Sequence, residues 1–431
     1  MPSDTLSSYP GKPFAPQDLQ GICCFYTITI LLLPIVSIYA SPIESVSIGE
    51  LFLFFVMLVL LFDNTKKLGI KKNPFLIYVS YASMITLICC FLFMAISENY
   101  SVVDSLKRMF RDAFYFTLIL VFSPRYFDFR YGKSVIGQIA CITGFFVVLQ
   151  FVAYSLLGVY ISGIIPWLKT TISGGLTGSE LAAKFASTAE SDGFARGTGF
   201  FSEPAVVAQF MSVALLLELF PVKDSFSFKK PFFYTVTLIL TFSVNAYVSL
   251  LVCWSLWALC SSKKKKARVS LICLLVLIGI LIAMSNEKTA SVLKRLVELK
   301  NGERTSGSSV LRVVRGMAFY SEMPFFYQVF GSGFGNFIQF KALYSITTVY
   351  EEAAEYMNTN AYVLVSSGAI GFVLYLFALF GSSKGRVMVS AMIAIVVFMF
   401  GISSSIYSSP VFVIMLSFLM AAPKKEDVYE A

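Results

Sequence analysis

The segment RGTGFFSEPAVVAQF, residues 196–210, places one arginine and one glutamate at the entrance of an apolar helix. Pro204 fits the first helical turn, where the backbone N–H groups have no partner inside the helix. These N–H groups and the positive end of the helix dipole would lie beside Arg196 and Glu203, which predicts an anion site. The alternative is a salt bridge or a helix cap that anchors the preceding loop. Because charge is expensive to keep at the edge of a membrane helix, we favour a direct role in binding or chemistry.

A second group of arginines follows in the later half of the chain. Arg312 and Arg315 are three residues apart in SSVLRVVRGMAFY and share one face of a predicted helix, and Arg304 precedes them. A pair of guanidinium groups can hold a diphosphate through bidentate hydrogen bonds. Contact with anionic lipid headgroups is the alternative for this pair.

Three carboxylates crowd the segment YEEAAEY, at Glu351, Glu352 and Glu355. Repulsion between them favours proton uptake by one of them, which would make that residue a general base, and Glu355 is our first choice. A solvated helix face is the alternative. Glu203, next to a cation and a helix N-terminus, suits a structural ligand better than a base.

The composition excludes several kinds of site. The chain has no histidine, which removes imidazole bases, imidazole metal ligands and histidine-dependent triads. Its eight cysteines lie in or beside apolar runs and are expected to be packing residues. The glycines of GSGFGNF, residues 331–337, do not follow a strand of a βαβ unit, so they predict a tight turn near the membrane and no nucleotide site. We expect no metal, no cofactor and no nucleic-acid partner.

The elements that must position these residues are membrane helices. The chain of 431 residues is 57% hydrophobic and 14% charged, with a mean hydropathy of +0.76. We predict a single integral-membrane domain over residues 1–431, in which the first apolar run is a retained span and no signal peptide. The predicted spans are 21–40, 48–62, 75–96, 111–123, 134–158, 203–221, 231–243, 245–260, 268–284, 360–380, 387–405 and 408–422.

The distribution of lysine and arginine predicts the orientation. With both termini in the cytoplasm, most of the 34 basic residues fall in short cytoplasmic segments, as the positive-inside rule requires. Two long loops, 159–202 and 285–359, then lie outside, and the second contains the amphipathic stretch SVLKRLVELK at 291–300. The apolar run 231–260 could be one tilted helix, but two short helices turning at 243–245 keep the lysine cluster 263–266 inside, and we prefer them.

Three segments resemble the Wzy-type O-antigen and capsule polymerases, in the superfamily that also contains the O-antigen ligases. The first is Arg196-Gly-Thr-Gly-Phe-Phe-Ser-Glu-Pro-Ala, which opens a span after a large loop. The second is Thr241-Phe-Ser-Val-Asn-Ala-Tyr, similar to the polar turn between two short helices of that family. The third is Asn360-Ala-Tyr-Val-Leu-Val-Ser-Ser-Gly-Ala-Ile-Gly, which ends the second loop. Two features depart from the superfamily. The ligase histidine is replaced by Thr359, which favours a polymerase, and the arginine–ten residues–glycine motifs of some polymerases are absent.

The resemblance implies a GT-C-like, all-α polytopic membrane protein with about 12 transmembrane helices and two large periplasmic loops carrying amphipathic helices. It implies an enzyme of the bacterial inner membrane that faces the periplasm. This enzyme would transfer a growing glycan from undecaprenyl diphosphate to the terminal sugar hydroxyl of a lipid-linked repeat unit, without a metal. Membrane lipids and a chain-length regulator protein would be its other partners.

The site residues that follow from this reading come from both long loops and from the polar turn. Glu355, Glu203, Arg196 and Arg315 would be catalytic, and the substrate or its diphosphate would be bound by Arg196, Arg304, Arg312, Arg315, Asn245, Asn360 and Tyr362. A ligase is disfavoured by the missing histidine. A lipid-linked oligosaccharide flippase is the alternative from another class, and it should carry polar residues deep in the bundle, where the chain offers Gln138, Gln150 and Gln209.

Overall fold

The structure is a computed structural model, and it is helical throughout the residues that it describes. Beyond its helices these residues contain four isolated β-bridges and no longer strand. This confirms the predicted all-α class for the described part of the chain. Backbone alone is described for residues 17–20, 192 and 308–314. The described ranges are 17–43, 46–62, 73–97, 100–171, 175–222, 226–260, 308–346 and 357–425.

The helices follow the predicted spans closely. Every predicted span except 268–284 overlaps a helix, and 268–284 lies outside the described residues, as does the amphipathic stretch 291–300. In chain order the elements are α1 Gln17–Val36, α2 Ile48–Phe62, α3 Pro74–Ile96, α4 Val103–Thr117, the π-helical turn η1 Leu118–Phe122, α5 Ser123–Tyr126, α6 Phe129–Leu157, α7 Gly178–Asp192, α8 Pro204–Leu219, α9 Lys229–Leu240, α10 Val244–Cys260, α13 Ser308–Glu322, α14 Phe325–Phe330, α15 Phe337–Leu343, α16 Thr359–Gly381, α17 Met388–Ser403 and α18 Pro410–Ala421.

The membrane character rests on length and composition. Among the described residues, α3, α6 and α16 are long and apolar enough to cross a membrane, and several shorter apolar helices accompany them. Helix α18, with 12 residues, would extend only about 18 Å along its axis, less than a hydrocarbon core of about 30 Å. It is apolar on all sides because it is enclosed by protein, in contact with α1, α8 and α17. The number of crossings therefore stays a prediction.

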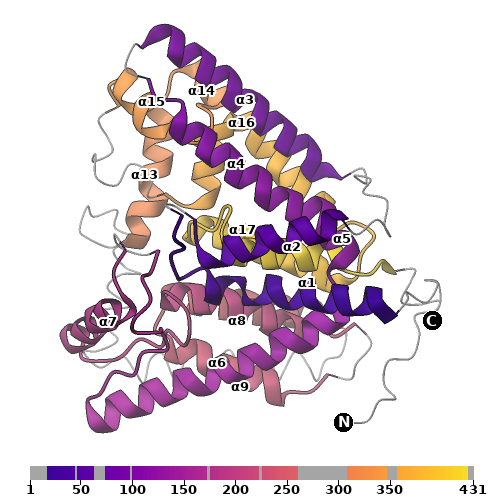
Figure 1. Cartoon of the computed structure of the whole chain (residues 1–431), viewed down its shortest axis with the longest axis vertical. Coiled ribbons are helices and arrows are strands. Elements are labelled where there is room, and N and C mark those ends of the chain that lie inside the picture. The colour runs from indigo at the N-terminus through magenta and orange to yellow at the C-terminus, as the bar shows by residue number, and fades with distance from the viewer. Residues whose placement is uncertain are drawn as a thin grey trace.

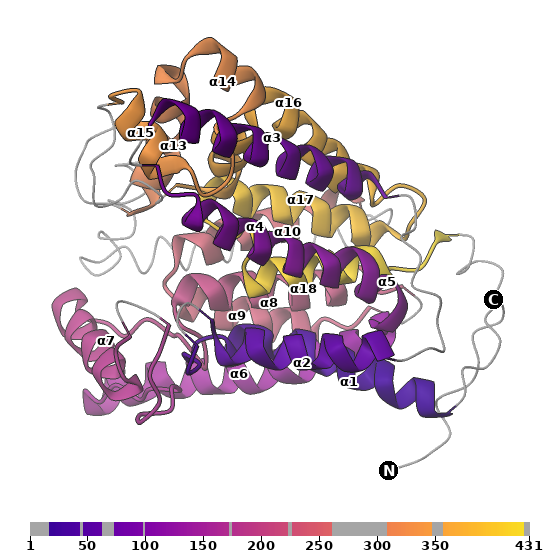
Figure 2. The ribbon, with the colours of Figure 1, turned by 45° about the horizontal axis from the view of Figure 1, so that its top comes forward.

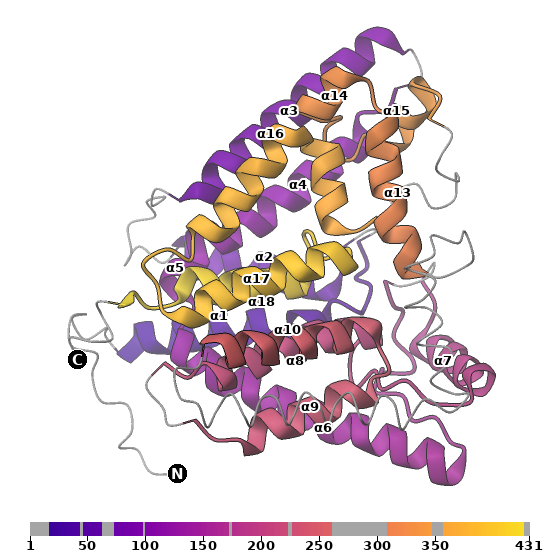
Figure 3. The same ribbon diagram turned by 180° about the vertical axis from the view of Figure 1, so that it is seen from behind.

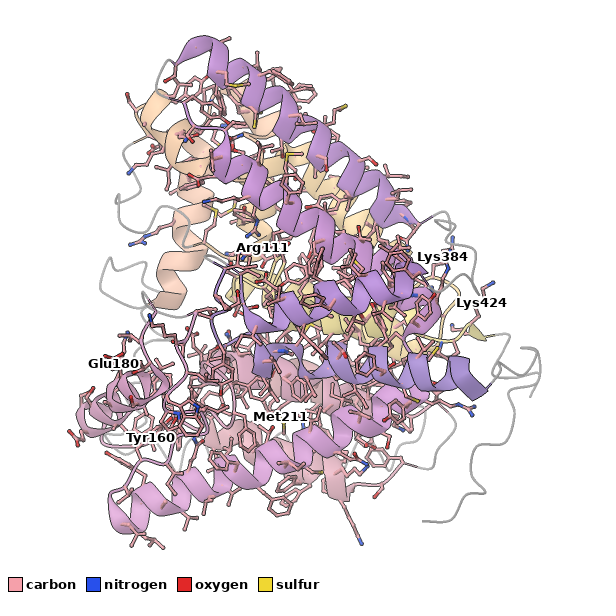
Figure 4. All side chains as sticks on the ribbon, viewed as in Figure 1. Arg111, Tyr160, Glu180, Met211, Lys384 and Lys424 are labelled. Carbon is pink, nitrogen blue, oxygen red and sulfur yellow. The ribbon has the colours of Figure 1, made fainter. Side chains whose placement is uncertain are left out.

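The helices form a stack with two distinct ends. Figure 1 shows α1, α2, α6 and α8 running side by side, while α3, α4 and α16 form an inclined group beside them. Seen from behind, α16 and α17 follow one another along this stack (Figure 3). Lys384 and Lys424 lie at one end of the helices, and Tyr160 and Glu180 lie at the opposite end (Figure 4). The first long loop and the segments that carry Lys384 and Lys424 are thus at opposite ends of the helices.

The first long loop has its own small fold. Helix α7 begins with a capping box, in which the Thr177 N–H and hydroxyl donate to the Glu180 carboxylate at 2.7 and 2.9 Å. These hydrogen bonds hold the pKa of the Glu180 carboxyl below its usual value. A bridge between Tyr39 and Thr170 joins the loop to the α1–α2 connection, and Leu181 is buried there. The loop is therefore fixed against the helix stack.

The apolar run 231–260 is two helices, as preferred from the sequence. Helix α9 ends at Leu240 and α10 begins at Val244, so the turn comes slightly earlier than the predicted 243–245. Phe242, inside this turn, has a positive φ of 47°. Asn245 consequently lies in the first turn of α10.

Helix α16 is broken in its middle by Gly368. This glycine has φ 67° and ψ −177°, a conformation that only glycine adopts readily. The break frees the carbonyls of Val365 and Ser366, which accept hydrogen bonds from the N–H groups of Ser332 (3.0 Å) and Gly333 (2.9 Å). The segment 331–337 is buried against α3 and α16, with α14 and α15 on either side of it (Figure 2). It closes a broken helix and is more than the tight turn expected from its glycines.

Candidate functional site

The Arg196 segment packs against the turn between α9 and α10. The Gly197 N–H donates to the Leu240 carbonyl at 3.4 Å, and the rings of Phe194 and Phe242 lie 4.7 Å apart between centroids. Arg196 itself is half-buried, with its guanidinium carbon 6.0 Å from the Phe194 ring. The first two segments that carry the family resemblance are therefore neighbours, since Gly197 of the first contacts the residue directly before the second.

Gln150 fixes the backbone that follows Arg196. Its Oε1 accepts from the N–H groups of Thr198 (3.1 Å) and Gly199 (3.0 Å), and its Nε2 donates to the Ile161 carbonyl at 2.8 Å. The Tyr160 hydroxyl adds a hydrogen bond of 3.1 Å to the Thr198 hydroxyl. Gln150, a buried residue of α6, thus holds the backbone of the first long loop at both of its ends.

The second and third segments meet at Ser404, the C-cap of α17. The Asn245 side chain donates to the Ser404 hydroxyl at 2.6 Å, and the Ser404 carbonyl accepts from the Thr359 N–H at 2.9 Å. The Thr359 hydroxyl accepts from the N–H groups of Ile406 (2.7 Å) and Tyr407 (3.0 Å). Thr359 therefore ties the start of α16 to the α17–α18 connection. The first turns of α10 and α16 are brought together at this point.

Asn360 is buried beside this junction. Its Nδ2 donates to the Phe398 carbonyl at 3.2 Å, which fixes the orientation of the amide. Its Oδ1 lies against Gly401 and has no hydrogen-bond partner among the residues that the structure describes. A buried acceptor without a donor is costly, so a bound hydroxyl or N–H group would stabilise it.

Helix α13 brings Arg315 to the same place. Gly316 is so close to Ala361 that a Cβ at this position would overlap the alanine side chain. Arg315 therefore lies beside the first turn of α16, and its side chain is half-buried. Within the described ranges it forms no ion pair or hydrogen bond. Its five N–H donors are not committed to a carboxylate there.

Helix α4 contributes a charged pair that was not among the predicted site residues. The Arg108 guanidinium lies over the rings of Tyr362 (5.2 Å) and Tyr407 (5.6 Å) and pairs with Asp112 at 3.4 Å. Asp112 also accepts a hydrogen bond from the Ser408 hydroxyl. Tyr362, a residue of the third segment that was predicted to bind substrate, is half-buried and lies under the Arg108 guanidinium. In the sequence this pair could have been noticed in the charged run KRMFRD, residues 107–112, at the start of the predicted span 111–123.

The next turn of α4 joins a second carboxylate. Arg111, labelled in Figure 4, pairs with Glu50 at 3.0 Å, and the Tyr115 hydroxyl donates to the same Glu50 oxygen at 3.0 Å. The Ser47 N–H and hydroxyl donate to the other oxygen. Glu50 therefore links α2 to α4, and both α4 arginines are held by carboxylates.

The remaining predicted residues divide into two groups. Glu203 is the N-cap of α8 and is exposed, and its side chain makes no capping hydrogen bond. Outside the described residues lie Arg304, the side chain of Arg312, and the carboxylates Glu351, Glu352 and Glu355. In the described ranges no group of three or more His, Cys, Asp or Glu residues could hold a metal ion.

No protein-family model matches the sequence, and no curated protein matches it significantly.

Proposed function

We propose that this protein is a polysaccharide polymerase of the inner membrane that uses a polyprenyl-diphosphate-linked donor. The acceptor sugar hydroxyl attacks the anomeric carbon of the donor glycan, the new glycosidic bond forms, and the bond to the lipid diphosphate breaks. The hydroxyl proton passes to a base and the lipid diphosphate leaves. The family resemblance of the three loop-side segments motivates this proposal.

The observation that carries the proposal is the environment of Arg315. A half-buried arginine without an ion pair in the described structure lies beside the start of α16, where Asn245 and Thr359 bring two helix N-termini together. Helix N-termini and guanidinium groups both stabilise phosphate oxygens, and their effect grows away from water. This combination suits a leaving diphosphate. Arg196, whose neighbours Phe194 and Gly197 contact the α9–α10 turn, is the second cation for it.

The flippase alternative receives less support from the described helices. Transporters often bind their substrates at broken membrane helices whose free backbone groups line a cavity. The break of α16 at Gly368 is instead filled by the segment 331–337, which takes the freed carbonyls of Val365 and Ser366. Gln150 is likewise committed to backbone groups of the first loop.

The direct test is polymerisation by the purified protein. Wild-type protein in detergent, given a lipid-linked repeat unit with an undecaprenyl diphosphate, is expected to form a ladder of longer glycans on lipid. The ladder should persist in the presence of a chelator, because arginines would stabilise the leaving diphosphate. Transbilayer movement of the lipid in vesicles without any glycan growth would show a flippase and contradict the proposal.

The structure does not bear on which residue is the general base, because Glu351, Glu352 and Glu355 lie outside the described residues. We expect Glu355→Gln to lower turnover by about 10²–10⁴-fold, the usual effect of losing a general base. The matched control is Glu190→Gln, which removes an exposed carboxylate from α7 in the first long loop. Normal turnover in Glu355→Gln and in the equivalent Glu351 and Glu352 variants would assign the role to Glu203 or to no side chain.

A further inference from the structure

A polar pocket lies at the end of the molecule that carries Lys384 and Lys424 (Figure 4). It has a volume of about 360 Å³ and is formed where α3 begins and α16 ends. Three of the residues that line it are basic, namely Lys384, Arg386 and Lys424, and none of them is acidic. It is separate from the candidate functional site, to which none of its residues belongs.

The pocket is built by hydrogen bonds that hold its walls. Arg386 donates from Nε to the Ser382 carbonyl at 3.0 Å and from its guanidinium to the Ala422 carbonyl. The Val387 N–H donates to the Pro423 carbonyl at 3.1 Å, so the chain after α18 is paired with the α16–α17 connection. Burial lowers the pKa of the Arg386 guanidinium, which means that its charge is partly removed from water. A desolvated cation at this position is stabilised by an anion.

The surface next to the pocket is apolar. On α3, Ile77 is 57% exposed, and on α16, Phe377 and Phe380 are 59% and 41% exposed. These two helices pack along each other and lead away from the pocket (Figures 1 and 3). A polar, basic pocket that continues into an apolar face matches a molecule with an anionic head and hydrocarbon chains.

We propose that this pocket binds the phosphate headgroup of an anionic phospholipid, whose acyl chains lie along α3 and α16. Lys384 and Lys424 are exposed and can move toward the phosphate, whereas Arg386 is fixed by its backbone partners. Basic pockets between membrane helices recognise lipid headgroups in this way. The inference is independent of the proposed polymerase activity.

The test is lipid retention by the purified full-length protein, measured by native mass spectrometry. Wild-type protein is expected to retain phosphatidylglycerol in preference to phosphatidylcholine. The double variant Lys384→Gln/Lys424→Gln should bind phosphatidylglycerol roughly thirtyfold more weakly, because both mobile cations are lost. Arg386 is left unchanged because its hydrogen bonds hold the fold together.

The matched control is Lys229→Gln/Lys425→Gln, which removes the same charge from two exposed lysines that do not line the pocket. This control should keep the affinity of the wild type. Equal weakening in both double variants, or no preference of the wild type for the anionic lipid, would overturn the proposal. Displacement of the lipid by millimolar inorganic phosphate would overturn it too, since the pocket would then be a site for free phosphate.

Discussion

Arg315→Ala is expected to lower glycan polymerisation by about 10²–10³-fold while the protein stays folded, because a developing charge on the leaving diphosphate loses a positioned donor. The side chain makes no ion pair or hydrogen bond in the described structure, so its removal leaves no charge or hydrogen-bonding group there without its partner. Arg196→Ala should have a similar effect, with long glycan chains lost. The measurement is the initial rate of ladder formation with purified lipid-linked repeat units, alongside the thermal unfolding midpoint of each variant.

Lysine at position 315 should restore only a small part of this activity, since an ammonium group cannot make the bidentate contact. The control is Arg130→Ala, which removes an exposed guanidinium from the first turn of α6. It should polymerise at the wild-type rate. Full-length polymer from both Arg315→Ala and Arg196→Ala would contradict the diphosphate role of these arginines.

Helix boundaries could be predicted from the sequence where they depend on residues close together in the chain. Pro204 at the first turn of α8 and the division of 231–260 into α9 and α10 both follow from proline chemistry and from charge balance. Asn245 and Asn360, both predicted to bind the substrate or its diphosphate, also lie close to one common junction. Ser404 carries no recognisable motif, and through the packing of α17 it bonds to Asn245 and to Thr359, the residue before Asn360.

The charged residues of α4 show why the rest could not be predicted. Arg108 and Asp112 have a spacing that fits any exposed helix. Nothing local indicates that Tyr362 of α16 and Tyr407 of the α17–α18 connection place their rings against the Arg108 guanidinium. Gln150 is a second residue whose role could not be predicted from its position in the sequence. It was one of the few polar residues expected deep in the bundle, where a transporter would carry such residues, whereas its partners are backbone groups some 50 residues later, at Thr198 and Gly199. Long-range pairing decides the role in both cases.

The tight turn predicted at 331–337 is present, but its role in the fold was not predictable for a related reason. Glycines at 331, 333 and 335 are typical of a turn, and all three do have a positive φ. Their partner is the break of α16, which a sequence of otherwise helical character does not reveal. Gly331 and Gly368 approach each other's segments so closely that a Cβ on either would overlap a backbone carbonyl oxygen, of Ser366 and Val329 respectively.

This close approach leads to the largest stability effect that we expect. Gly368→Ala should destabilise the protein by about 3 kcal/mol or more, since the new methyl group meets fixed backbone and the residue must keep a conformation that disfavours a side chain. The matched control is Gly158→Ala at the C-cap of α6, where φ is 66° and a Cβ would meet nothing within 4 Å. That variant carries only the left-handed strain, about 1–2 kcal/mol. The unfolding midpoints of both variants in the same detergent decide the matter. A Gly368 variant no less stable than the Gly158 variant would mean that the loop does not close the broken helix, and the carbonyls of Val365 and Ser366 would then be free to line a substrate path.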